Sequence, residues 1–90
     1  MRHPLTAAVM AVLNEVDPYG LEPGGKDGCP VDEYAPEASA FAGVLTRRGR
    51  ATVDDVDRIW QRWFNEPLTG VIGRDAVTEF VARLNDLTQR

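Results

Sequence analysis

The chain is short of the residues that most often carry out chemistry. Its 90 residues include one cysteine, one histidine and one lysine. Cys29 has no second cysteine with which to form an internal disulfide or a CxxC metal site. His3 lies just before the first predicted helix, in a segment prone to fraying, so no histidine is placed to activate a nucleophile. We therefore predict that the protein is not an enzyme and needs no cofactor.

Long apolar runs are also missing. No stretch approaches the roughly 18 apolar residues that a membrane-spanning helix requires. Residues 5–13 are apolar on one face, but they lack the basic start and the small-residue cleavage site of a signal peptide, so they are typical of a core helix. Because a single cysteine also agrees with a reducing compartment, we predict a cytoplasmic protein that does not contact membranes.

The composition that remains is sufficient for one small domain. A hydrophobic fraction of 43% with 27% charged residues is ordinary for a soluble globular protein. A chain of this length has room for one core only. Residues 1–90 are therefore predicted to form a single helical domain.

Apolar residues recur at helical spacing in four stretches of the chain. The predicted helices cover residues 4–16, 36–48, 53–66 and 74–87. Residues 68–73, which include two glycines, are predicted to be a short connection between the last two helices. No stretch alternates with a period of two, so the predicted fold class is all-α, as a small four-helix domain.

The third predicted helix has the clearest start signal. Thr52 is followed three residues later by Asp55, an acidic relative of the capping box, in which two side chains each accept a backbone N–H at the start of a helix. The apolar stripe of this helix comprises Val53, Val56, Ile59, Trp60 and Trp63. We expect both tryptophans to be buried, because a domain of this size needs their area in its core.

Between the first two helices lies a stretch that cannot itself be helical. Residues 17–36, which we call the acidic segment, contain four of the six prolines and four of the eight glycines. From Glu15 to Glu37, seven acids stand against one lysine, a charge of -6, whereas the rest of the chain carries +2. We expect a shaped loop that is held down by its own apolar side chains and pairs with Arg47, Arg48 and Arg50. The overall balance lacks the basic stripe that neutralises phosphates, so a nucleic-acid partner is not predicted.

Two short motifs flank the acidic segment. They are the run Asn14-Glu15-Val16-Asp17-Pro18-Tyr19-Gly20 and the run Asp32-Glu33-Tyr34. Together they resemble the YugE-like family of small bacterial helical proteins, from whose pattern Val16 and Ala35 depart. The resemblance covers about 30 of the 90 residues and implies a compact all-α fold. It supplies no catalytic residue, and related small acidic helical proteins act as immunity or antitoxin-like partners.

Two functional hypotheses use the acidic segment. In the first, the chain is a non-enzymatic interaction module, an immunity-like or regulatory protein that presents the segment to a basic surface of a partner. The predicted binding residues are Asp17, Tyr19, Glu22, Asp27, Asp32, Glu33 and Tyr34. In the second, the same carboxylates bind a divalent metal or a small molecule, although their spacing does not follow an EF-hand. A purely structural role, in which Asp17 and Asp32 cap helix ends and turns, is the third possibility.

Overall fold

The protein is all-α. The computed structural model describes residues 4–20 and 34–88, and within those ranges it contains helices and no strand. The helices are α1 (Pro4–Val16), α2 (Ala35–Arg48), α3 (Val53–Phe64), α4 (Leu68–Ile72) and α5 (Arg74–Asp86). None of them is long and apolar enough to cross a membrane.

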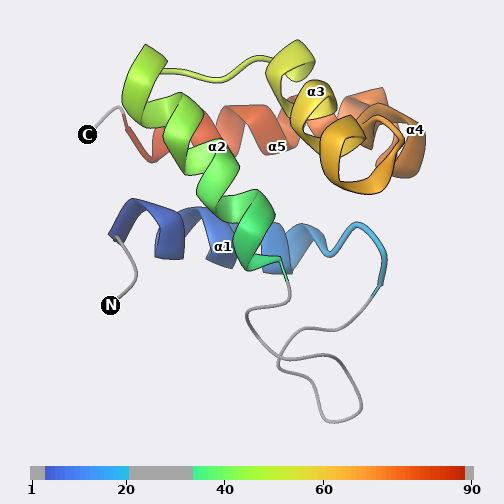
Figure 1. Cartoon of the computed structure of the whole chain (residues 1–90), viewed down its shortest axis with the longest axis horizontal. Coiled ribbons are helices and arrows are strands. Elements are labelled where there is room, and N and C mark those ends of the chain that lie inside the picture. The colour runs from blue at the N-terminus through green and yellow to red at the C-terminus, as the bar shows by residue number, and fades with distance from the viewer. Residues whose placement is uncertain (1–3, 21–33, 89–90) are drawn as a thin grey trace, which may run out of the picture.

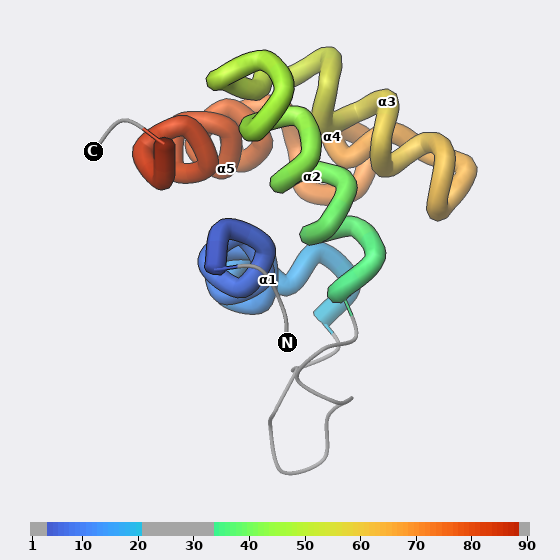
Figure 2. Tube along the Cα trace, turned by 60° about the vertical axis from the view of Figure 1, so that its left-hand side comes forward, coloured from blue at the N-terminus to red at the C-terminus, as the bar shows by residue number. Residues whose placement is uncertain are grey.

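Helices α1 and α5 lie along one another in opposite directions, and α2 crosses α1 (Figure 1). In the view turned by 60°, the start of α1 is seen nearly end-on, α5 lies above it, and α3 and α4 lie to the right of α5 (Figure 2). The buried apolar residues of these helices form one cluster. At its centre is Trp60 of α3, whose indole is fully buried and stacks parallel to the ring of Phe41 from α2, with centroids 6.3 Å apart.

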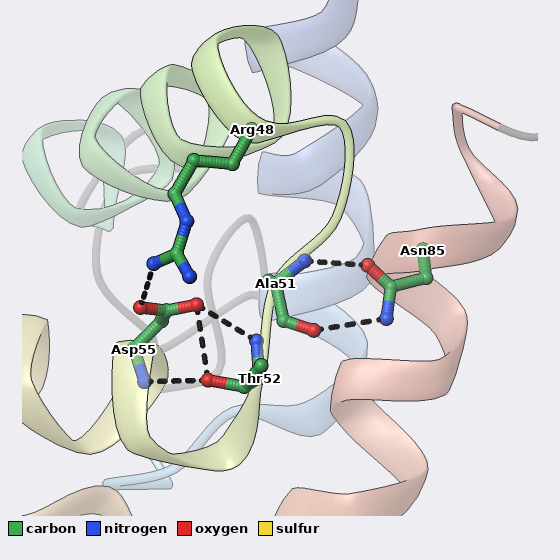
Figure 3. Close-up of polar contacts among 5 residues, drawn as sticks. All are labelled: Arg48, Ala51, Thr52, Asp55 and Asn85. Carbon is green, nitrogen blue, oxygen red and sulfur yellow. Dashed lines mark hydrogen bonds and ion pairs between the residues drawn. The ribbon is translucent and has the colours of Figure 1, made fainter.

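Local sequence signals account for where α3 begins. Thr52 and Asp55 form the predicted capping box: the Asp55 N–H donates to the Thr52 hydroxyl at 3.2 Å, and the Thr52 N–H donates to the Asp55 carboxylate at 3.0 Å. The other Asp55 oxygen accepts from Arg48 of α2 at 2.7 Å (Figure 3). The capping box thus also joins the end of α2 to the start of α3.

The connection between α2 and α3 is fixed to α5 by one side chain. Gly49 ends α2 with a positive φ of 79°, a conformation that favours glycine. The carboxamide of Asn85 then accepts from the N–H of Ala51 at 2.7 Å and donates to the carbonyl of the same residue at 3.0 Å (Figure 3). A single asparagine therefore satisfies both backbone groups of a buried residue and ties the connection between α2 and α3 to α5.

Two details differ from the sequence prediction. The segment predicted to be a plain connection, 68–73, contains the one-turn helix α4. Its first turn is capped from a distance, because Asp57 of α3 accepts from both the N–H and the hydroxyl of Thr69 at 2.9 Å. The prediction that Trp63 is buried was wrong: its side chain is 49% exposed. The buried side of α3 is centred on Trp60 and turns toward Phe64, whereas Trp63 lies along the edge that carries the half-buried Ile59.

Candidate functional site at the ends of the acidic segment

The structure brings together three of the seven predicted binding residues. Asp17, Tyr19 and Tyr34 meet where α1 ends and α2 begins. Glu22, Asp27, Asp32 and Glu33 lie outside the described residues. The described part of the site comprises the two ends of the acidic segment, residues 17–20 and 34–36.

At the first end, the chain leaves α1 through a sharp reversal. Pro18 disfavours an α conformation in the residue before it, and Asp17 has a φ of 47°, in the left-handed region. The Asp17 N–H still donates to the carbonyl of Leu13 at 2.8 Å, so the last turn of the helix is closed. Its carboxylate accepts a hydrogen bond of 3.1 Å from the hydroxyl of Tyr34. The first residue of the segment thereby contacts its far end.

Tyr34 closes the other end from inside the protein. Its side chain is 1% exposed, and its ring centroid lies 6.2 Å from that of Trp60. The Tyr34 hydroxyl also accepts from the N–H of Tyr19 at 3.3 Å, in addition to donating to Asp17. Each end of the acidic segment is thus bonded to the other through one phenol.

Tyr19 connects these ends to the core. Its ring contacts Phe64 edge to face, with centroids 5.0 Å apart, and its hydroxyl accepts from the indole N–H of Trp60 at 3.1 Å. The same hydroxyl donates to the carboxylate of Glu66 at 2.8 Å. Burial, followed by the hydrogen bond and negative charge of Glu66, raises the pKa of Tyr19, although the Trp60 hydrogen bond acts in the opposite sense. The phenol therefore stays protonated as a donor to Glu66 at neutral pH.

Sequence reasoning missed the residues that complete this arrangement. Trp60 and Glu66 lie 41 and 47 residues away from Tyr19 along the chain, so no local spacing pattern connects them. It also assigned Arg48 to the acidic segment, whereas the structure pairs Arg48 with Asp55 of α3. The carboxyl of Asp55 is buried, which acts to raise its pKa, but hydrogen bonds from Thr52 and the charge of Arg48 outweigh that effect and lower the pKa.

Metal binding receives no support from the part of the chain that the structure describes. Within residues 4–20 and 34–88, no group of three or more histidine, cysteine, aspartate or glutamate side chains could hold a metal ion. Asp17 is the one predicted metal-binding carboxylate within these ranges, and it accepts from a phenol.

Comparisons with known proteins leave the chain without an assigned family. No family model, no curated protein sequence and no solved structure matches it. The resemblance to the YugE-like family stays a prediction from the two short motifs.

Proposed function

We propose that this chain is a non-enzymatic protein-interaction module, an immunity-like or regulatory protein whose acidic segment binds a basic surface of a partner protein. The observation that carries the proposal is the arrangement of Asp17, Tyr19 and Tyr34, which bonds both ends of the segment to one aromatic cluster in the core. Fixing the two ends lowers the entropy that the segment loses when it binds, and so favours recognition through it.

The parts of the segment contribute differently in this proposal. Tyr19 and Tyr34 pack against Trp60, so they hold the ends in place. Contact with the partner then falls to the acids between them, of which Glu22, Asp27 and Glu33 are the strongest candidates. Their negative charge would steer a basic partner toward the segment and raise the rate of association.

The test removes charge from the segment without changing its size. In one variant, Glu22→Gln, Asp27→Asn and Glu33→Gln are combined. A matched control combines Asp54→Asn, Glu79→Gln and Asp86→Asn, which removes the same charge from three exposed positions on α3 and α5. Wild type and both variants are melted and then used for affinity capture from a native lysate at several salt concentrations.

We expect the segment variant to lose a protein that wild type and the control variant retain, while its melting temperature is unchanged. The captured protein should be basic and should dissociate from wild type as salt rises. Retention of every captured protein by the segment variant would contradict the proposal. A rise of several degrees in the melting temperature on adding calcium, magnesium or zinc would favour the metal-binding alternative, since a ligand at 100 times its dissociation constant adds about 2.7 kcal/mol.

A further inference from the structure

A groove between α2 and α3 gathers positive charge on an otherwise acidic protein. It has a volume of about 380 Å³. Four arginines line it, Arg47 and Arg48 from α2 and Arg58 and Arg62 from α3, against one acid, Asp55. The net charge of the whole chain is -4, so the local charge of this groove has the opposite sign. We call this hollow the arginine groove.

The one acid in the arginine groove is already engaged. One oxygen of Asp55 accepts from Arg48, and the other accepts from both the N–H and the hydroxyl of Thr52 (Figure 3). The other three arginines, at positions 47, 58 and 62, form no ion pair with any residue in the described ranges 4–20 and 34–88. Three of the four arginines that line the hollow thus have no ion-pair partner among the described residues.

The floor of the arginine groove is apolar and close to backbone. Val44 is buried beneath it, and Ile59 is half-buried on the opposite helix. Gly43 has no side chain to fill the space, and a Cβ added there would lie 3.3 Å from Nη1 of Arg47. The exposed indole of Trp63 follows Ile59 by four residues, and therefore comes next along the same face of α3. The groove offers apolar area between charged walls.

We propose that the arginine groove binds an acidic peptide segment of a partner protein, through carboxylate–guanidinium pairs and one apolar side chain on the floor. Guanidinium groups bind carboxylates with two parallel hydrogen bonds, which favours a directed contact. Arg58 and Arg62 are one helical turn apart, about 6 Å along the axis. Acids at alternate positions of an extended peptide are about 6.6 Å apart, so the two repeats match.

Charge and size favour a peptide over a nucleic acid. Outside residues 15–37 the chain sums to only +2, so it lacks the broad positive surface that a long phosphate backbone needs. A short segment with a few acids needs only the arginines of the groove. This surface also differs from the acidic segment of the proposed function, so either proposal can fail without the other.

The binding test uses a fluorescein-labelled eight-residue peptide in which glutamate alternates with leucine, and measures fluorescence anisotropy with the full chain. The matched peptide has glutamine in place of each glutamate, and a 12-nucleotide single-stranded DNA is the polyanion probe. Arg58→Gln with Arg62→Gln removes the pair on α3. The control, Arg50→Gln with Arg74→Gln, removes the same charge from two exposed positions outside the groove.

A second variant tests the location without changing any charge. Gly43→Leu keeps the charge of every arginine but puts a side chain into the groove, where the guanidinium of Arg47 has to move aside for it. Leucine is also the better helix former, so α2 should not be weakened. Ala11→Leu, at an exposed position of α1, is the matched control. Circular dichroism melts establish that each variant is folded.

We expect wild type to bind the glutamate peptide and not the glutamine peptide. The Arg58/Arg62 variant should bind it about tenfold more weakly, which corresponds to about 1.4 kcal/mol, while the Arg50/Arg74 control changes little. Gly43→Leu should weaken binding and Ala11→Leu should not. The proposal is overturned if wild type does not bind the glutamate peptide, if both double variants lose affinity equally, or if the DNA binds as tightly with the same dependence on Arg58 and Arg62.

Discussion

Trp60 and Trp63 lie three residues apart on α3, yet one is fully buried and the other is 49% exposed. Around Trp60, aromatic rings from α2, α3 and the ends of the acidic segment pack closely, and the indole N–H has a partner. Along the edge that carries Trp63, α3 borders a groove whose arginines at positions 47, 58 and 62 pair with no described residue. The comparison separates a side of α3 that packs in the core from a side that borders the arginine groove.

The largest effect should come from exchanging the two tryptophans for alanine. Trp60→Ala removes the ring at the centre of the core, so we expect the free energy of unfolding to fall by about 3–5 kcal/mol. Trp63→Ala removes a side chain that is only half-buried, so a smaller loss of about 1–2 kcal/mol is expected. Urea unfolding followed by circular dichroism measures both. Similar losses in the two variants would mean that Trp60 and Trp63 contribute equally to the core, which would contradict the comparison.

A smaller loss should follow when the partner of the Trp60 indole is removed. Tyr19→Phe keeps the ring but leaves a buried N–H without its acceptor, which costs about 1–3 kcal/mol. Glu66→Gln changes the other, exposed partner of the same hydroxyl and keeps an oxygen that can accept, so a cost of about 0–1 kcal/mol is expected. If Tyr19→Phe is as stable as wild type, the hydroxyl does not stabilise the core.

The capping box should make stability depend on pH. The pKa of Asp55 is lowered in the folded protein, so the unfolded chain takes up the proton first as the solution is acidified. The contribution of Asp55 is complete above the ordinary aspartate pKa, about 3.9, and is lost as the pH falls through the lower folded-state pKa.

Asp55→Asn tests that contribution. At neutral pH it should cost about 1 kcal/mol, a typical contribution of one hydrogen bond, and it should flatten the fall in stability below about pH 4. The control is Asp54→Asn, at an exposed position in the same turn of α3. An acid dependence that is unaltered by Asp55→Asn and abolished by Asp54→Asn would reverse the roles given to the two residues.

The smallest effect should come from the side that borders the arginine groove. Arg58→Gln with Arg62→Gln removes two exposed charges that form no ion pair with a described residue. The free energy of unfolding should therefore change by about 0.5 kcal/mol or less. Equilibrium unfolding in urea at low and high salt measures it. A loss of 2 kcal/mol or more, well above the roughly 0–1 kcal/mol of an exposed charge pair, would place these arginines among the residues that maintain the fold.

Much of the fold could be predicted from the sequence because its signals are local. Proline, glycine and the Thr52–Asp55 spacing each act within one turn, so the bounds of α1, α2, α3 and α5 follow from them to within one or two residues at most ends. Helix α4 could not be predicted in this way, because it has only five residues and its cap, Asp57, is twelve residues from Thr69. Likewise, helical spacing places Trp63 on the apolar stripe of α3. Whether that part of the stripe is covered depends on where the neighbouring helices lie, which the spacing does not reveal.

The candidate site shows the same limit. The charge of the acidic segment is evident in the composition, and the structure adds what holds its ends: Tyr34 to Asp17, and Tyr19 to Trp60 and Glu66. Those bonds join residues 15 to 47 positions apart, which no single periodic pattern connects. The four-residue spacing of Arg58 and Arg62 puts them on one face of a helix, but that they line one groove with Arg47 and Arg48 depends on how α2 packs against α3.

The division of α3 into a side that packs in the core and a side that borders the arginine groove is tested most directly by acrylamide quenching of the two tryptophans. In wild type, we expect one quenchable indole and one protected indole, and Trp63→Phe should remove the quenchable fraction. The protected fraction should become quenchable only when the protein is unfolded. Equal quenching of both tryptophans in the folded protein, or protection of both, would contradict the account.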